Sequence, residues 1–514
     1  MAQQGANGPG GQDAKKVALV FPSGLEKKGN ALVLSDQGNN KIQAINLSTD
    51  QDISILGLTI QPGKLETLVT GPSFLPTEPS NPKAIVQDPD DANIFYIADS
   101  FSNRILKLEV DQRNVSVIAG NGLSRSEENK NGDGGEAINA VIGNPTSLAI
   151  WKDNNTKFLL VADNGSFKTV GGRQKTVGHV RIINLGTNDL SIGSVNGLQQ
   201  NRIDTLIGGG GNSTFDLSGA DPRTIQLEKI TSVAVDTPES GKLPCIYVAT
   251  YSSNLQQARI LAFNPNGTGY DYDFTINGSN VQVQAGTVST IAMEGGAGFL
   301  NNFQNNFQNP KSLGTFSSFG QISFLGGARP ASSSQELVLF LPLADENLIL
   351  AINYYSLAIN LFGFILNSGE GTRICGRLAT SGFFFPDNYG YNGDFISPKS
   401  ALLANPTGVQ YIAPTTASNN REMLLIADTD NGRIRAILGR GFPSSSKNLI
   451  VTFAGSGITG FNGDTLPSND THLSNPQGFW LYFMQVDSIY KPLLAICDSS
   501  NSRIRRVVPS FLVK

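Results

Sequence analysis

Four turns of the chain combine an aspartate with a basic residue five positions later, a combination that could serve acid–base chemistry or metal binding. The pairs are Asp36 and Lys41, Asp99 and Arg104, Asp428 and Arg433, and Asp498 and Arg503. A carboxylate at the end of a strand also accepts hydrogen bonds from turn N–H groups, and a nearby cation can pair with it. Because a catalytic site is needed only once, a repeated pair predicts a structural turn.

An oxygen-rich, glycine-rich loop is the one segment that could hold a hard cation. Its candidate ligands are Asn131, Asp133 and Glu136. Calcium prefers oxygen ligands, but the full EF-hand pattern with its terminal glutamate is absent. We therefore expect a glycine-rich turn, with Ca²⁺ as the only metal these residues could take, and we predict no other cofactor.

The sequence contains few residues that could form a zinc site or a nucleophilic catalytic site. The chain has 2 histidines, His179 and His472, and 3 cysteines that lie far apart in sequence. A catalytic zinc needs several protein ligands, commonly histidines. A hydrolase of the Ser-His-Asp type would need a GxSxG turn between a strand and a helix, which the sequence lacks. Neither chemistry is predicted, and no catalytic residue is assigned.

Two aromatic-rich segments are the candidate binding residues. The first contains Phe299, Phe303 and Phe307, and the second contains Phe383, Phe384, Phe385, Tyr389 and Tyr391. Large aromatic side chains supply contact area in recognition. They can equally fold inward and fill space between structural units, so the sequence leaves binding and internal packing both open.

The elements that position these residues are short strands that recur along the chain. Apolar runs on either side of a polar turn, as in LLIADTDNGRIRAIL, predict β-hairpins. The turns open at positions 36, 99, 163, 250, 345, 428 and 498. An apolar run, usually led by Asn-Pro, precedes each hairpin, and a strand ending in glycine commonly follows it. The pattern therefore predicts four antiparallel strands in each unit.

Repeats of this length, built from short strands, are typical of a radial array. The predicted fold is all-β: a single β-propeller of four-stranded antiparallel blades, with seven blades and six as the fallback. The propeller is expected over residues 16–514. Residues 1–15 are polar and glycine-rich, and they predict a disordered tail.

The hairpins and the loops between units share further residues. These are Ala98-Asp99, Ala162-Asp163 and Ala427-Asp428 in the hairpins, and Gly132-Asp133-Gly134-Gly135, Gly393-Asp394 and Gly463-Asp464 in the loops. In this pattern the chain resembles the NHL-repeat family over nearly its whole length, which implies a β-propeller. Members of that family include scaffolds, receptor modules, RNA binders and a few lyases or hydrolases, so the resemblance implies no activity.

Composition narrows the choice of partners and compartment. A net charge of −4 and a pI of about 5.4 give no basic surface for phosphate backbones, so nucleic acid is not expected. No long uncharged apolar run predicts a membrane span. The low charge and the Asn-x-Ser/Thr sites, Asn46 among them, favour an extracellular or secreted protein without deciding the compartment.

The sequence therefore predicts a non-enzymatic binding or interaction scaffold that uses the loop-bearing face of the propeller. In a propeller the loops between the second and third strands and the loops between blades emerge on the same face. The partner would be a protein or a second copy of the chain. The alternative is a calcium-assisted lyase or hydrolase with its site at the mouth of the central channel.

Overall fold

Strands and single turns of 3-10 helix make up the regular structure of the described residues in this computed structural model. The described residues are 11–14, 17, 19–20, 22–48, 50–70, 79–112, 114–123, 132–153, 156–170, 173–214, 217–236, 242–252, 257–268, 270–276, 279–293, 323–326, 337–344, 346–354, 357–368, 371–377, 388–415, 418, 420–463, 466–486, 489–501 and 503–507. Among them, no helix is long and apolar enough to span a membrane.

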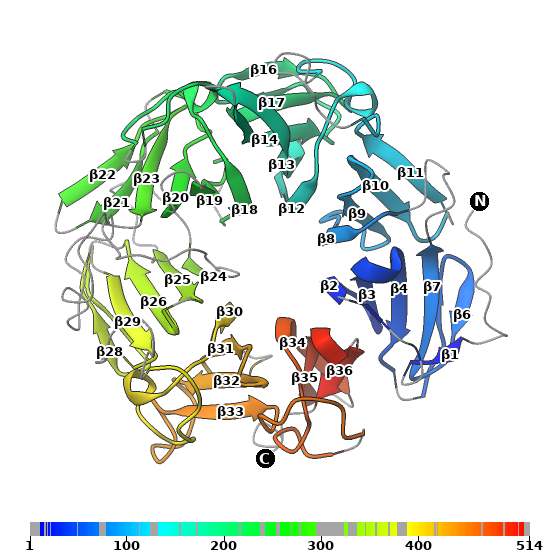
Figure 1. Ribbon diagram of the computed structural model, residues 1–514, viewed down its shortest axis with the longest axis vertical. Helices are drawn as coiled ribbons and strands as arrows, with labels where there is room; N and C mark the ends of the chain where they lie inside the picture. The colour runs from blue at the N-terminus through cyan, green and yellow to red at the C-terminus, as the bar shows by residue number, and fades with distance from the viewer. Residues whose placement is uncertain are drawn as a thin grey trace.

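The strands form sheets that stand around a central axis, with one strand of each sheet at the centre of the ring (Figure 1). Blade 1 contains β2 (Pro22–Lys28), β3 (Ala31–Asp36), β4 (Lys41–Asn46) and β7 (Lys64–Thr70). Blade 2 contains β8 (Pro82–Gln87), β9 (Ile94–Asp99), β10 (Arg104–Glu109) and β11 (Asn114–Ala119). Blade 3 contains β12 (Pro145–Asp153), β13 (Thr156–Val170), β14 (Arg173–Asn184) and β17 (Ile203–Gly208).

The remaining sheets continue around the ring in chain order. Blade 4 contains β18 (Lys229–Val235), β19 (Ile246–Ser252), β20 (Gln257–Phe263) and β23 (Val288–Met293). Blade 5 contains β24 (Ser323–Gly326), β25 (Leu337–Leu343), β26 (Leu348–Asn353) and β29 (Gly371–Cys375). Blade 6 contains β30 (Pro406–Ile412), β31 (Met423–Asp428), β32 (Arg433–Leu438) and β33 (Ile450–Ala454). Blade 7 contains β34 (Pro476–Val486), β35 (Ile489–Asp498) and β36 (Arg503–Val507).

The predicted all-β propeller of four-stranded antiparallel blades is confirmed. Within the described residues, six sheets have at least four strands, which is the fallback count, and blade 7 has three. The residues that follow Val507 lie outside the described part of the chain. Of the segment predicted as a tail, residues 1–10 also lie outside it, whereas β1 (Gln12–Asp13) pairs with the outer edge of β7.

The core lies between neighbouring blades. The central strands β3, β26 and β31 are buried along their whole length because a blade packs against each face, so they read as continuous apolar runs. One buried cluster joins Val33 of blade 1 to Ile97 of blade 2. Another joins Leu32 of blade 1 to Ala495 of blade 7. The ring is therefore closed by packing of its first and last blades.

Asparagines in the left-handed conformation link successive blades. The backbone N–H groups of Asn81, Asn144 and Asn405 donate to the side-chain oxygens of Asn40, Asn103 and Asn347, at 2.7, 2.9 and 2.8 Å respectively. All six residues have a positive φ between 41° and 57°. Asparagine tolerates this conformation better than most residues. The Asn-Pro pairs seen in the sequence are therefore the points where one blade is attached to the turn of the preceding blade.

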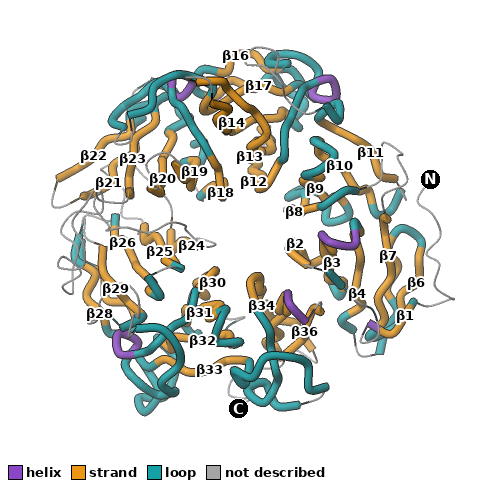
Figure 2. The backbone as a smooth tube through the Cα atoms, in the orientation of Figure 1, coloured by secondary structure: helices purple, strands orange, loops and turns teal. Residues whose placement is uncertain are grey.

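In four blades of the described chain, the connection from the third to the fourth strand forms a small two-stranded hairpin. These hairpins lie at the outer border of the ring (Figure 2). They are β5 (Ile53–Ile55) with β6 (Leu58–Ile60), β15 (Leu190–Ile192) with β16 (Val195–Leu198), β21 (Tyr272–Ile276) with β22 (Ser279–Val283), and β27 (Ile359–Leu361) with β28 (Phe364–Leu366).

Each hairpin is held by a buried asparagine that is the last residue of the third strand or, for Asn264, the residue after it. The side-chain amide of this residue donates two hydrogen bonds of 2.7 to 2.9 Å to carbonyl groups at the two ends of the hairpin. The four residues are Asn46, Asn184, Asn264 and Asn353. Because Asn46 is buried in this role, the sequence pattern for glycosylation there describes a structural residue.

Substitution of Asn184 by alanine should therefore lower the free energy of unfolding by about 2–3 kcal/mol, because buried carbonyl groups lose their donors. Chemical denaturation of the purified variant measures the change. Asn188→Ala is the matched control, since that side chain is exposed in the same connection. Equal stability of the two variants would contradict a structural role for Asn184.

Candidate functional site

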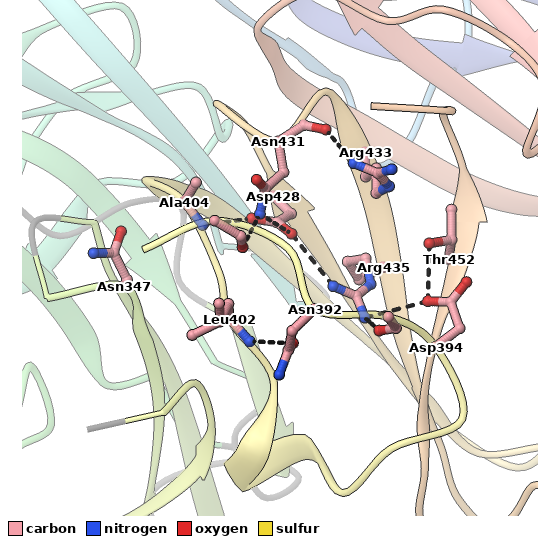
Figure 3. Close-up of polar contacts among 12 residues, drawn as sticks. Asn347, Asn392, Asp394, Leu402, Ala404, Asp428, Asn431, Arg433, Arg435 and Thr452 are labelled. Carbon is pink, nitrogen blue, oxygen red and sulfur yellow. Dashed lines mark hydrogen bonds and ion pairs between the residues drawn. The ribbon is translucent and has the colours of Figure 1, made fainter. Parts of the chain in front are cut away.

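The carboxylate of Asp428 ties the turn after β31 to the segment that enters β30 (Figure 3). Its Oδ1 accepts the backbone N–H of Ala404 at 2.7 Å, and its Oδ2 accepts the side-chain amide of Asn431 at 2.9 Å. Asp36 and Asp498 make the same two bonds with their own neighbours. The recurrence supports the prediction that these aspartates hold turns.

The basic residues five positions later do not behave alike. Of the four predicted pairs, Arg104 and Asp99 alone form the ion pair among the residues that the structure describes, at 2.7 Å. Arg433 donates instead to the carbonyl groups of Asn431 and Ser456, at 2.9 and 2.5 Å. The side chain of Arg503 lies outside the described residues. A shared position in sequence therefore does not give a shared partner.

A second arginine, two residues further along the third strand, is the ionic partner that the sequence analysis missed. Arg435 lies 3.6 Å from the Oδ2 of Asp428, and both side chains are fully buried. Equivalent pairs join Arg181 to Asp163 at 3.6 Å and Arg505 to Asp498 at 3.5 Å. The repeated Ile-Arg pair in β32 and β36 could have pointed to this second arginine. The sequence alone does not show that it faces the aspartate, because that depends on strand register.

The same arginines hold the Gly-Asp loops that arrive from the preceding blade. Arg435 donates to the carbonyl of Gly393 at 2.8 Å and to Asp394 at 3.2 Å, and Thr452 donates to Asp394 at 2.9 Å (Figure 3). The buried arginine thus forms an ion pair with its own turn on one side and hydrogen bonds with an incoming loop on the other. We call this arrangement the arginine clamp.

One of the candidate calcium ligands, Asp133, is part of the clamp in blade 3. Asp133 accepts hydrogen bonds from Arg181 at 2.7 Å and from Thr205 at 3.0 Å, and Glu136 accepts one from Asn139 at 2.9 Å. Asn131 lies outside the described residues. Within the part of the chain that the structure describes, no group of three or more His, Cys, Asp or Glu side chains is placed to hold a metal ion.

Burial governs the protonation of the turn aspartates. It raises the pKa of Asp428 to about 6, although the neighbouring Arg435 and the N–H of Ala404 act in the opposite direction. Burial likewise raises the pKa of Asp36, Asp99 and Asp498 above the ordinary value. The shift accompanies a structural carboxylate that is removed from water.

The aromatic candidates are described only in part. Phe299, Phe303 and Phe307, and the group Phe383, Phe384 and Phe385, lie outside the described residues. Tyr389 is exposed, and its hydroxyl lies 3.3 Å from Asp430. The ring of Tyr391 lies under the guanidinium groups of Arg433 and Arg435, which are 3.7 and 4.8 Å from its centroid. Tyr391 therefore packs on the clamp while its outer surface stays exposed.

Further apolar side chains are exposed on the loops that enter blades 6 and 7. Phe395 belongs to the loop that enters blade 6, and Ile458, Phe461 and Leu466 belong to the loop that enters blade 7. Phe461 repeats the position of Tyr391, because both precede an Asn-Gly-Asp sequence, and its ring lies 4.9 Å from Arg505. Alignment of the two loops would have found this residue.

Phe395 combines exposure with backbone strain. Its φ is 57°, in the left-handed region, and 64% of its surface is exposed. The loop entering blade 3 has Gly134, with a φ of 73°, at the equivalent place after Gly-Asp. A bulky residue in this conformation is uncommon and costs energy unless other contacts compensate. Leu56 and Phe362 share the conformation, but both are buried.

Comparisons with known proteins add a structural likeness. No family model and no curated protein matches the chain. It is similar to auxiliary nutrient binding proteins from Bacteroides thetaiotaomicron and Bacteroides ovatus, at 12% and 10% sequence identity and a TM-score of 0.39 each. These matches cover 97% and 96% of this chain and 99% of each of those chains. Mala s 1 of Malassezia sympodialis matches at 11% identity and a TM-score of 0.33, over 80% of this chain and 87% of that chain. Similarity at this level carries no functional conclusion.

The turn role of Asp428 predicts a stability effect. Asp428→Ala should lower the free energy of unfolding by about 2–3 kcal/mol, because the N–H of Ala404 and the amide of Asn431 lose a buried acceptor. Asp430→Ala changes an exposed carboxylate in the same turn and serves as the control. Denaturation curves that place both variants at the wild-type midpoint would refute the turn role.

The raised pKa of Asp428 predicts a pH dependence. Between the unfolded-state pKa of about 4 and the folded-state value of about 6, the folded chain binds more protons than the unfolded chain. The stability contributed by protonation is therefore complete below about pH 4 and is lost as the pH rises through about 6. Unfolding of the wild type and of Asp428→Asn across this range measures the effect. Parallel pH profiles would contradict it.

Proposed function

We propose that this propeller is a non-enzymatic binding scaffold whose loop-bearing face takes a protein partner or a second copy of the chain. The observation that carries the proposal is the set of exposed apolar side chains on the inter-blade loops. Among them is Phe395, which is held in a strained backbone conformation at the outer edge of blade 6, beside the start of β33. In the free chain the side chain of Phe395 is not buried, so no packing contacts compensate for the strain in its backbone. Such residues concentrate at functional sites, where the partner supplies the compensating contacts.

The side chain of Arg433 links the loops that enter blades 6 and 7. The guanidinium of Arg433 covers the ring of Tyr391 from the loop entering blade 6. It also donates to the carbonyl of Ser456, at the start of the loop entering blade 7. The two loops therefore meet at this side chain. Exposed apolar side chains on two loops that meet in this way favour an interaction site.

The loops are also held firmly, which favours binding. Asn392 accepts the N–H of Leu402 at 2.7 Å and donates to the carbonyl of Ser400 at 2.8 Å. Asn462 makes the corresponding bonds to His472 and Asp470. A surface that is ordered before its partner arrives loses less conformational freedom on association. Aromatic side chains on such a surface are the commonest large contributors to affinity.

The alternative, a calcium-assisted lyase or hydrolase, has no observation in its favour among the described residues. Its proposed ligands Asp133 and Glu136 are hydrogen bonded to Arg181, Thr205 and Asn139. The turn aspartates are similarly bonded to backbone and amide groups of their own turns.

Phe395→Gly separates binding from folding. Glycine accepts a positive φ without strain, so the variant should be as stable as the wild type or slightly more stable. Association should weaken about tenfold or more, because a central aromatic contact is lost. Sedimentation velocity measures self-association, and a photo-crosslinking residue at position 395 in extracts of the source cells identifies a foreign partner.

Phe101 supplies the control, since it is exposed on the turn between the second and third strands of blade 2. Phe101→Ala should leave association unchanged, and a crosslinker at position 101 should not capture the partner. Unchanged association of Phe395→Gly, or identical crosslinked products at positions 395 and 101, would show that the binding surface is elsewhere.

A further inference from the structure

A polar cavity of about 210 Å³ lies between blades 5 and 6. Its walls include Phe362 in the turn between β27 and β28, Glu422 just before β31, and Arg440, Lys447 and Asn448 in the connection from β32 to β33. These connections join first to second and third to fourth strands, so they lie on the face opposite the loop-bearing face. The cavity is smaller than the usual site for a drug-sized molecule, which limits its occupant to a small ligand.

Glu422 places a buried carboxylate in the wall of this cavity. Its Oε1 accepts the hydroxyl of Tyr411 at 2.9 Å, and its Oε2 accepts the backbone N–H of Arg440 at 3.1 Å. Among the described residues it forms no ion pair within 4.0 Å. Gly439 makes room for it, because a side chain there would meet Oε2 at 2.6 Å. A carboxylate removed from water without a countercharge favours a bound cationic group.

Asn448 adds a buried acceptor that has no donor. Its Oδ1 is buried in the structure and has no hydrogen-bond partner. Its amide nitrogen would lie 2.6 Å from a Cβ at Gly363, so the opposing turn leaves space for the side chain only because glycine stands there. Buried acceptors are nearly always paired in folded proteins, and an exception indicates a missing donor.

The mouth of the cavity carries the opposite charge. Arg440 and Lys447 are both exposed, and neither forms an ion pair among the described residues. Their donors suit a carboxylate, which arginine can bind in a bidentate manner. Phe362 is buried and contributes the apolar wall.

We infer that this cavity binds a small zwitterion of the α-amino acid type. The ammonium group meets the carboxylate of Glu422 and the Oδ1 of Asn448, and the carboxylate meets Arg440 and Lys447. A simple anion would leave the charge of Glu422 without a counter-ion and the Oδ1 of Asn448 without a donor, and a simple cation would meet two positive side chains on entry. The zwitterion satisfies both halves of the cavity, and this inference is independent of the partner proposed for Phe395.

Isothermal titration of the full chain with glycine, alanine, serine and glutamate tests the inference, with acetate and methylammonium as half-ligands. At least one amino acid should bind, and about tenfold more tightly than either half-ligand, since each charged hydrogen bond contributes separately. Absence of binding by every amino acid, or equal binding by acetate, would overturn it.

Two kinds of variant locate the site. Asn448 has a φ of 65°, so Asn448→Gly removes the acceptor without backbone strain and should leave the melting temperature unchanged. Affinity for the amino acid should fall about tenfold. Lys447→Gln and Arg440→Gln should weaken binding of the amino acid and show a reduced dependence on salt.

Asn420→Gly is the matched control, because Asn420 is exposed, has a φ of 55° and does not line the cavity. It should bind the amino acid as the wild type does. Wild-type affinity in Asn448→Gly and in both glutamine variants would place the ligand elsewhere and overturn the inference. Loss of binding in all three variants, with Asn420→Gly unaffected, would support it.

Discussion

The rest of this structure depends on the contacts of a buried carboxylate that ends the second strand in blades 1, 2, 6 and 7 and lies within it in blade 3. In blade 6, Asp428 joins the turn after its own strand to the segment that enters the inner strand. The buried Arg435 then connects that carboxylate to the loop arriving from blade 5. Hydrogen bonds and one ion pair therefore connect the turn, the blade entry and the inter-blade loop. Burial of the Asp428 carboxylate costs desolvation energy, which is why its pKa is raised. The ion pair and hydrogen bonds around the carboxylate act against this cost.

These shared contacts explain which surface residues can differ from blade to blade. Because the arginine clamp holds the Gly-Asp loops by backbone carbonyls and one carboxylate, the residues beside these groups are free to differ between blades. Tyr391 and Phe461 stack on clamp arginines, whereas Phe395 projects into solvent. A repeated scaffold thus presents different side chains at equivalent places. Binding surfaces commonly develop in such loops, since changes there do not disturb the core.

The two faces of the ring differ in how their sites are built. The loop-bearing face exposes aromatic side chains on loops that are already ordered. The opposite face encloses charged and amide groups in a small cavity at the junction of blades 5 and 6. Both sites lie between neighbouring blades, where segments distant in sequence meet. Junctions of this kind are where a propeller gains chemical variety without changing its strands.

Local patterns in the sequence by themselves determined the strands, the turns and the ring. Hairpin alternation, Asn-Pro entries and turn aspartates are set by backbone geometry within a few residues, so they can be read directly from the sequence. Only the tertiary structure decided that Arg435, rather than Arg433, pairs with Asp428, because strand register and the incoming loop fix the partner. It likewise decided that Asn46 holds a hairpin, that Phe395 is exposed under strain, and that Glu422 and Asn448 share a cavity. These facts depend on contacts between segments far apart in the chain, which spacing within a single repeat does not specify.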